Sequence, residues 1–452
     1  MKKIAELKEI IAGGEFDEKL AQIYLDKDIR RRLLYTFFIL VVVRLGSLIT
    51  VPGISADAIR EYMQNALGDS LNIFSSFTGG SFEQMSIFAL SVTPYITASI
   101  IIQLLTIAIP ALEELQKDGE DGRKKITAIT RYMTVGLAIL ESAGLVVGFG
   151  NKGVIENYNF WTVLCIVVIL TAGSAIVMWL GERATEKGVG NGISVILLIN
   201  IVSTMPNDFK NLYTQFMKGR DFVRFTLVGL IILAVVVITV VFVCALQGAE
   251  RRIPVQYAKT VRGRKTMGGQ SSHIPLKVNT AGVIPVIFAS SILSVPQIVV
   301  NLFNIKTSGV GAKIIQGMSQ GYWFNRSYPW ASIGLIVYIL LVFFFAYFYT
   351  AITFNPMEIA NNMKKSGGFV PGIRPGQSTQ DYLNKILNYI IFIGAVGLII
   401  VACIPMFFSG FFGANVSFGG TSLIIVVGVV IETIKNIESR MLVRNYQGFL
   451  LD

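Results

Sequence analysis

The sequence predicts an all-α polytopic membrane protein of ten transmembrane helices. Hydrophobic residues make up 53% of its 452 residues and charged residues only 15%, and the mean hydropathy is +0.62. This composition excludes a soluble globular enzyme. Long apolar stretches alternate with loops that carry nearly all of the charge. We expect helices in the apolar stretches because lipid cannot satisfy the open edge of a β-sheet.

Ten stretches approach the roughly 20 apolar residues that a helix needs to cross about 30 Å of hydrocarbon. They are residues 33–51, 82–109, 132–148, 160–180, 193–205, 222–247, 281–303, 330–354, 386–408 and 421–437, of which the fifth is short. Proline is expected to kink two of these spans, at Pro94 in the second and at Pro285 and Pro296 in the seventh. Residues 1–32 form a charged amphipathic segment without the pattern of a cleaved signal peptide.

The positions of Lys and Arg predict the orientation of the spans. Most of the 39 Lys and Arg residues lie in segments that share one side of the membrane when the N-terminus is inside. The positive-inside rule therefore places both termini, including the C-terminal tail 441–452, in the cytoplasm. It also places there the two long loops of the chain, residues 248–278 and 355–385.

These two loops, which we call the cytoplasmic arms, are basic and rich in turn residues. Their glycines indicate specific turns that a topology signal does not need, namely Gly263, Gly268, Gly269, Gly372 and Gly376. The net charge of +11 suits anionic lipid, the phosphates of RNA or an acidic protein surface, and charge does not choose among them. The arms predict a docking surface for a large cytoplasmic partner.

No residue pattern predicts a metal site, a cofactor site or a catalytic group. Cys165, Cys244 and Cys403 all lie within predicted spans, where we expect them to pack as small apolar residues. His273 is the only histidine and stands alone in a basic loop. We therefore predict that the protein is not an enzyme and binds no cofactor.

The segment after the first span allows two interpretations. Residues 71–77 (LNIFSSF) are apolar but too short to span a membrane, and glycines follow them. They form either a half-helix that re-enters the membrane from outside or an amphipathic helix on the outer surface. Arg44, Glu141 and Glu432 are the ionisable residues within spans, and each is expected to face protein or water. They are too isolated to form a proton relay, which argues against a pump.

Two proline-containing spans, one in each half of the chain, fit a pair of inverted repeats, residues 33–206 and 207–440. This pattern leaves two main functional classes open. One is a membrane protein whose arms dock a large cytoplasmic partner. The other is a secondary solute transporter of inverted-repeat type, which has no need for large arms. A structural membrane scaffold is a third and weaker alternative, since it does not explain the paired spans.

Several motifs resemble the SecY/Sec61 family, the central channel subunits of the Sec protein translocase, and they appear in the same order. The matching segments are RLGS (44–47), PGI (52–54), PYI (94–96), QLL (103–105), GEDGRKK (119–125), GVGNGIS (188–194), QSSHIPLKVN (270–279), KKSGGFVPGIRPG (364–376) and FGGTS (418–422). The resemblance covers the chain from the first span to the last. Glu141 departs from the neutral polar residue that the family leads us to expect there.

The resemblance implies two pseudo-symmetric five-helix halves around a central pore. At mid-membrane it implies an apolar ring, which we call the ring positions, at Val92, Ile96, Leu197, Ile284, Ile287 and Ile425. A dry apolar ring blocks ions when empty and holds no passing chain tightly. By residue type alone, these side chains could equally be ordinary packing residues.

Two further elements follow from the resemblance. A plug, within about residues 64–80, would close the outer side of the pore with Leu71, Ile73, Phe74 and Phe77. A lateral gate between the second and seventh spans would include Thr97, Gln103, Asn279 and Pro285. Hydrogen bonds across such a gate would favour the closed state by about 1 kcal/mol, and an apolar signal sequence would replace them.

The partners follow from the resemblance as well. It implies that the arms bind the SecA motor ATPase or the ribosome through Arg262, Arg264, Lys265 and Arg374. Arginine suits both partners because it binds carboxylates and phosphates in a bidentate manner. SecE-type and SecG-type small membrane subunits, signal sequences, nascent polypeptides and anionic lipid complete the expected partners. The expected location is the bacterial cytoplasmic membrane.

Overall fold

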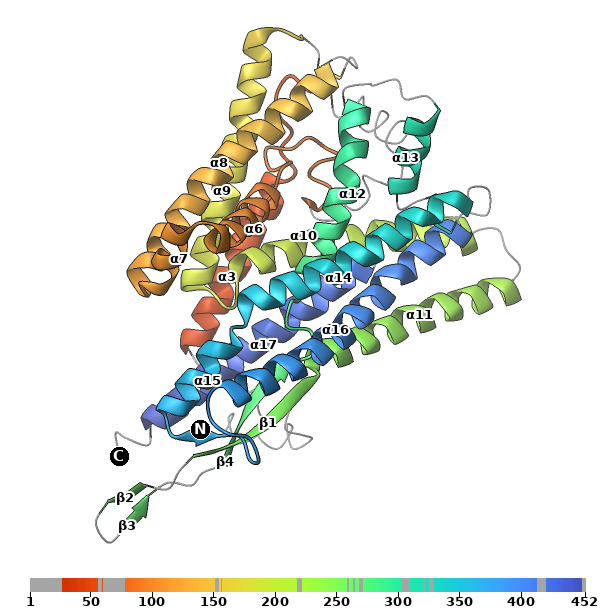
Figure 1. Ribbon diagram of the computed structural model, residues 1–452. Coiled ribbons are helices and arrows are strands. Elements are labelled where there is room, and N and C mark those ends of the chain that lie inside the picture. Colours follow the sequence, from red (N-terminus) through yellow and green to blue (C-terminus); the bar gives the residue numbers. More distant parts are fainter. Residues whose placement is uncertain are drawn as a thin grey trace, which may run out of the picture. The chain divides into compact units, whose positions relative to one another are not determined.

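The computed structural model describes residues 27–55, 59, 78–150, 154–155, 157–217, 222–257, 260–262, 265–267, 271–302, 309–319, 322–324, 329–412 and 420–448. Within these residues the chain is mostly helical, as predicted (Figure 1). Six described helices are long and apolar enough to cross a membrane, and a bent helix pair would make a seventh. The protein is therefore a multi-pass membrane protein, while the total of ten spans stays a prediction.

The chain divides into two compact units, which we describe one at a time. Unit 1 holds helices α3 to α9, the N-terminal part of α10 and the C-terminal part of α17. Unit 2 holds the C-terminal part of α10, helices α11 to α16, the strands and the N-terminal part of α17. The divisions fall between Ser203 and Thr204, within α10, and between Ile431 and Glu432, within α17. The predicted segments 1–32, 33–206, 207–440 and 441–452 stay predictions.

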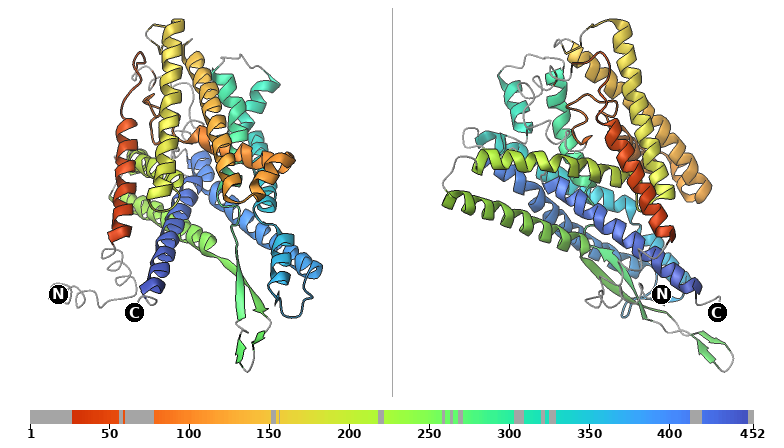
Figure 2. Two further views of the ribbon diagram at one scale, coloured as in Figure 1. Left: turned by 90° about the vertical axis from the view of Figure 1, so that its left-hand side faces the viewer. Right: turned by 180° about the vertical axis from the view of Figure 1, so that it is seen from behind.

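The helices of unit 1 are largely those that hydropathy predicts. They are α3 (Lys27–Gly46), α6 (Thr93–Ala108), α7 (Pro110–Lys117), α8 (Glu120–Gly150), α9 (Phe160–Lys187) and α10 (Gly192–Leu212). Helices α8 and α9 pack against each other (Figure 2). Arg131 of α8 and Glu182 of α9 form an ion pair of 2.8 Å between Nε and Oε1. The short fifth span proves to be part of a longer helix, α10.

The structure corrects both predicted ends of the second span, residues 82–109. Residues 79–92 form turns and a bridge, so the helix α6 begins only at Thr93 and Pro94 lies in its first turn. The predicted kink at Pro94 is therefore wrong: a proline in the first turn of a helix lacks only an N–H that would have no partner within the helix anyway. The other end breaks at Ile109, which is extended because Pro110 follows it. There α6 and α7 meet at an angle of 104°.

Unit 2 contains five helices of 19 to 36 residues, the last of which it shares with unit 1. They are α11 (Phe222–Gly248), α12 (Ile284–Leu302), α14 (Ile333–Thr353), α16 (Gln377–Phe412) and α17 (Gly420–Gly448), with the shorter α13 (Val310–Met318) and α15 (Pro356–Lys365). A π-helical turn (Tyr213–Met217) precedes α11 and a 3-10 turn (Pro329–Ser332) precedes α14. Pro285 lies in the first turn of α12, so the kink expected there is wrong as well, while Pro296 does lie inside this helix.

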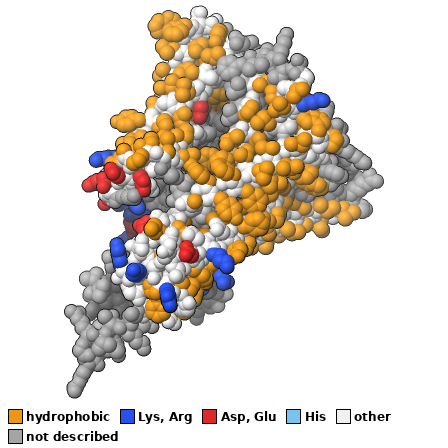
Figure 3. Space-filling view, in the orientation of Figure 1, with side chains coloured by type: hydrophobic (Ala, Val, Ile, Leu, Met, Phe, Trp, Pro, Cys, Tyr) orange, Lys and Arg blue, Asp and Glu red, His pale blue; other side chains and the backbone are white. Residues whose placement is uncertain are grey.

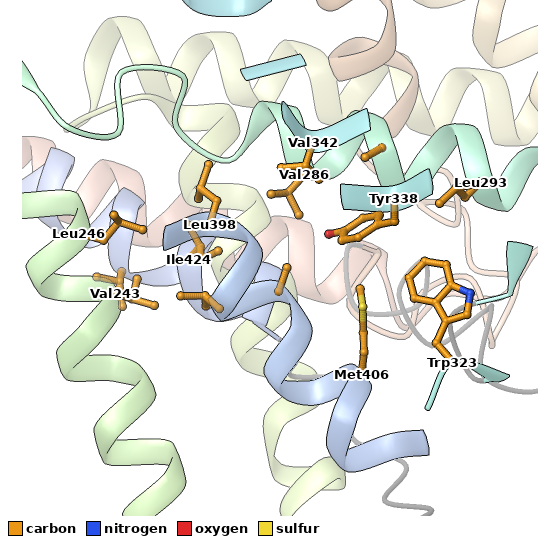
Figure 4. Close-up of a cluster of buried hydrophobic side chains, with 14 residues drawn as sticks. Val243, Leu246, Val286, Leu293, Trp323, Tyr338, Val342, Leu398, Met406 and Ile424 are labelled. Atoms are coloured by element: carbon orange, nitrogen blue, oxygen red, sulfur yellow. The ribbon is translucent and has the colours of Figure 1, made fainter. Parts of the chain in front are cut away.

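Buried side chains from five helices fill the core of unit 2 (Figure 4). The core includes Val243 of α11, Val286 of α12, Val342 of α14, Leu398 of α16 and Ile424 of α17. At one end the rings of Trp323 and Tyr338 lie 5.5 Å apart, and Trp323 Nε1 donates to the Gly317 carbonyl at 2.7 Å. The outward sides of α14 and α16 remain apolar and exposed (Figure 3). Such a surface suits lipid contact.

The two cytoplasmic arms build a small β-sheet that hydropathy alone does not predict. The strands are β1 (Glu250–Tyr257), β4 (Ser271–Lys277) and β5 (Gly368–Phe369) in the order β4-β1-β5, with a separate hairpin of β2 (Thr260–Arg262) and β3 (Lys265–Met267). All neighbouring strands are antiparallel. Strand β1 of the first arm thus pairs with β5 of the second (Figure 1). We call the three-stranded sheet the arm sheet.

Candidate functional site

Three of the six ring positions lie together in unit 1. Val92 is the N-cap of α6, Ile96 lies one turn into that helix, and Leu197 lies on α10. All three belong to one apolar cluster that also includes Ile39 and Val43 of α3. Val92 is completely buried, whereas Ile96 is half-buried. We call this group the ring cluster. The ring cluster therefore brings together apolar side chains from the start of α6 and from α10.

The other three ring positions lie in unit 2. Ile284 is the first residue of α12, and Ile287 follows it by three residues on the same side of the helix. Both are half-buried. Ile425 of α17 is buried, and its neighbour Ile424 belongs to the core of unit 2. The six ring positions therefore divide equally between the two units.

Two of the predicted gate residues lie in α6, and the other two lie just before and at the beginning of α12. On α6, Thr97 is half-buried with its hydroxyl donated to the Thr93 carbonyl at 3.1 Å, and Gln103 is exposed. In unit 2, Asn279 precedes α12 and is 7% exposed, while Pro285 is buried in the first turn of this helix. The Asn279 Nδ2 has no hydrogen-bond partner within the described ranges. A buried amide group without a partner is costly.

The predicted plug residues Leu71, Ile73, Phe74 and Phe77 lie outside the described residues. The segment that follows them is described, since Thr78 is buried and Gly79 and Gly80 adopt φ values of +67° and +79°. These values explain the two glycines because other residues rarely adopt this conformation.

The predicted docking residues lie in the two arms. Arg262 and Lys265 end β2 and begin β3, and Arg264 lies outside the described residues. Arg374 is exposed, and its carbonyl accepts the Thr379 hydroxyl at 2.9 Å. The turn around Arg374 uses Gly372 (φ +82°) and Gly376 (φ +105°), as the turn chemistry predicted.

The arm sheet stands on its own apolar core. The inward-facing residues Ile253 and Val255 of β1 and Leu276 of β4 are buried, and they pack with Leu383 of α16 and Met363 of α15. Arg252, Pro254 and Gln256 of β1 alternate with these and are exposed, and Arg251 near the start of the strand is exposed as well. The sheet therefore holds a basic surface on a rigid base. Lys364 and Lys365 at the end of α15 are also exposed.

Sequence reasoning missed the arm sheet and one polar residue. The alternation of Ile253 and Val255 with polar neighbours was a signal for β1. The missed polar residue is Asn200, which lies in the apolar run of α10 and is buried. An amide within a predicted span was the signal for it. Across the described part of the chain, no group of His, Cys, Asp and Glu has the arrangement of a metal site.

Comparison with known proteins gives a consistent result. The SecY family model matches residues 86–434. The chain is 44% identical over 444 residues to a protein translocase subunit SecY from Streptomyces galbus, which covers 95% of this chain and 99% of that one.

Two solved structures share the fold. A SecY protein whose plug domain stabilises the closed state of the translocation channel has a TM-score of 0.61 and 17% identity, with 92% of this chain and 93% of that chain covered. Sec61 in the canine ribosome–channel complex has a TM-score of 0.58 and 16% identity, with the same coverage. These neighbours are protein-conducting channels, which favours the channel over the solute transporter.

Proposed function

The chain belongs to the SecY family, and on this premise we propose that it is the channel subunit through which unfolded secretory polypeptides cross the cytoplasmic membrane of a bacterium. It also releases transmembrane segments sideways into lipid. The channel is passive, and a partner motor or the ribosome drives transport. The observation that carries the proposal is the ring cluster, in which Val92, Ile96 and Leu197 come together from two helices.

The ring cluster supports this function through its chemistry. Its members are apolar, so an empty passage that they line repels water and ions, while an extended polypeptide meets no group that would hold it tightly. The proposed ring also includes Ile284, Ile287 and Ile425 of unit 2. Half-burial of Ile96, Ile284 and Ile287 fits side chains that face a narrow passage.

The gate and the plug are parts of the same proposal. Asn279 supports the gate, because its buried amide lacks a hydrogen-bond partner in the part of the chain that the structure describes. Gln103 and Thr97 supply polar groups from α6, and Pro285 starts α12 beside the gate. For the plug, support comes from the related SecY protein of similar fold, whose plug domain maintains a membrane seal. Leu71, Ile73, Phe74 and Phe77 are its proposed apolar members here.

The arms are the proposed docking site for the SecA motor and the ribosome. The arm sheet supports this role because it joins both arms on one apolar core. The positive charge comes from Arg262, Arg264, Lys265 and Arg374. Sec61, which shares the fold, has been solved in a ribosome–channel complex. Both termini lie in the cytoplasm, and SecE-type and SecG-type subunits and anionic lipid surround the channel.

Crosslinking from the ring tests the proposal. Ile96 is replaced by a photoreactive residue in membrane vesicles that carry a stalled secretory chain. We expect an adduct that requires a functional signal sequence and either a motor or a ribosome. The same replacement at Leu340, which is 63% exposed on α14, serves as a lipid-facing control and should give no adduct. Absence of the adduct at Ile96 in active vesicles would refute the proposed channel.

A further inference from the structure

A group of buried polar side chains in unit 1 meets at the point where α6 begins. Asn200 Nδ2 of α10 donates to the Ser91 hydroxyl at 2.9 Å, and the Ser174 hydroxyl of α9 donates to the Ser91 carbonyl at 3.3 Å. Ser91, Ser174 and Asn200 are each no more than 2% exposed. Two helices therefore hold one residue of the turn that precedes α6.

A second contact joins this group to α3. Arg44 Nη1 donates to the Gly79 carbonyl at 3.1 Å. Gly79 lies against Asn200 as well, since a Cβ atom on this glycine would stand 2.9 Å from both Arg44 Nη1 and the Cα of Asn200. The glycine backbone thus fits between the arginine of α3 and the asparagine of α10. Any side chain there would push the two apart.

Ser91 has a backbone conformation that needs such support. Its φ is +48°, in the left-handed region that residues other than glycine rarely adopt. Residues of this kind persist where their surroundings hold them in place. The next residue is Val92, whose carbonyl accepts the N–H of Ile96 at 3.0 Å. The conformation of Ser91 therefore sets the direction in which α6, with its two ring positions, leaves the turn.

Asn200 also stands beside the third ring position of unit 1. It follows Leu197 by three residues on α10, so the two side chains lie on the same side of the helix. One residue thus contacts the turn before α6 and shares a helix face with Leu197. The polar group lies next to the ring cluster but contributes no side chain to it.

We propose that Asn200 and Arg44 are positioning residues for the apolar ring. By holding Ser91 and Gly79, they keep Val92, Ile96 and Leu197 together while the channel is idle. This inference rests on the proposed function. Loss of either donor leaves buried polar groups unpaired and frees the start of α6, so the idle channel leaks ions.

The test measures ion leak through idle channels in membrane vesicles that contain the full chain with its native partners. We expect Asn200→Ala and Ser91→Ala each to raise the leak at least threefold. The double variant should leak no more than the leakier single variant, because both changes break the same hydrogen bond. Thr134→Ala is the matched control: Thr134 is fully buried, but its hydroxyl bonds only within α8, to the Thr130 carbonyl.

Arg44 gives an independent arm of the experiment. Arg44→Met removes the donor to Gly79 and should raise the leak, whereas Arg44→Lys keeps a charged donor and should restore most of the seal. If Asn200→Ala does not accumulate, Ser91→Ala, which removes one hydroxyl only, carries the test. A leak that rises equally in every variant, Thr134→Ala included, would overturn the inference because it would reflect general destabilisation.

Ile96→Gly separates this inference from the proposed function. This variant opens the ring directly and should leak. If Ile96→Gly leaks while the Asn200, Ser91 and Arg44 variants remain sealed, the positioning role is wrong and the channel proposal stands. If Ile96→Gly remains sealed and the crosslink from position 96 is absent, the channel proposal itself fails.

Discussion

The ring cluster of unit 1 and the arm sheet of unit 2 place their charged and polar groups in opposite ways. In the ring cluster the side chains are apolar, and the nearby polar groups of Ser91 and Asn200 are buried and bonded to each other. In the arm sheet the apolar residues are hidden beneath the strands, and Arg251 and Arg252 face outward. The comparison shows that polar groups near the ring hold the protein's own helices, whereas Arg251 and Arg252 on the arms are exposed.

The largest effect is expected from breaking the core beneath the arm sheet. Leu383 is completely buried there, so Leu383→Ala should destabilise this region by about 2–5 kcal/mol. Limited proteolysis of the arms and thermal denaturation in detergent would measure the change. Leu340→Ala, at an exposed site on α14, should leave both unaffected. Unchanged protease resistance in Leu383→Ala would show that the arms do not depend on this core.

A smaller effect is expected from crowding the helices around the ring cluster. A Cβ atom on Gly173 of α9 would collide with the carbonyl of Ile87, so Gly173→Ala should cost about 1–3 kcal/mol. A Cβ on Gly136 of α8 would meet nothing within 4 Å, and Gly136→Ala should stabilise by about 0.4–1 kcal/mol. The melting temperatures of the purified variants should move in opposite directions. A shift of the same sign in both would refute the close contact at Gly173.

The exposed charge of the arms should affect transport without affecting stability. Arg374→Glu reverses the charge at an ordered, exposed turn, and we expect motor-driven translocation to fall about tenfold, equivalent to about 1.4 kcal/mol. Lys313→Glu makes the same charge change on the exposed side of α13, outside the arms, and should be silent. Equal transport by both variants would mean that Arg374 does not contact the motor.

The smallest effect is expected from a charge pair that holds only the protein's own helices. Arg131 and Glu182 join α8 and α9, but Arg131 is half exposed, so the pair should contribute only about 0.2–1 kcal/mol. A double-mutant cycle with Arg131→Ala and Glu182→Ala, measured by thermal denaturation, gives this coupling. A coupling well above this range would place the pair among the main supports of unit 1.

Hydropathy predicts most of this fold because each membrane helix satisfies its own backbone hydrogen bonds. It fails where the pairing is between distant residues: the match of Gln256 in β1 with Phe369 in β5 depends on two segments that no local pattern relates. Proline was misread for a different reason. Pro94 and Pro285 start helices rather than bending them, and local sequence does not reveal which helical position a proline takes.

The candidate site also has parts that local sequence predicts and parts that it does not. The ring positions rest on family resemblance, since residue type alone does not separate Val92 or Leu197 from ordinary packing residues. Ser91 and Asn200 are 109 residues apart in the sequence, and only the folded structure brings them together. The exposed turn at Arg374 was the easiest part to predict because its glycines are a local signal.

The arm sheet also has a consequence for how the chain is made. Strands β1 and β4 both belong to the first arm, so they can pair as soon as Lys277 has emerged from the ribosome. The other edge of β1 has no partner until Gly368 and Phe369 follow, after α12 and α14 have been synthesised. Throughout this interval a newborn molecule carries an open strand edge, the kind of edge that chaperones cover and that aggregating chains exploit. The last strand therefore closes the sheet only when the membrane helices between the arms are already complete.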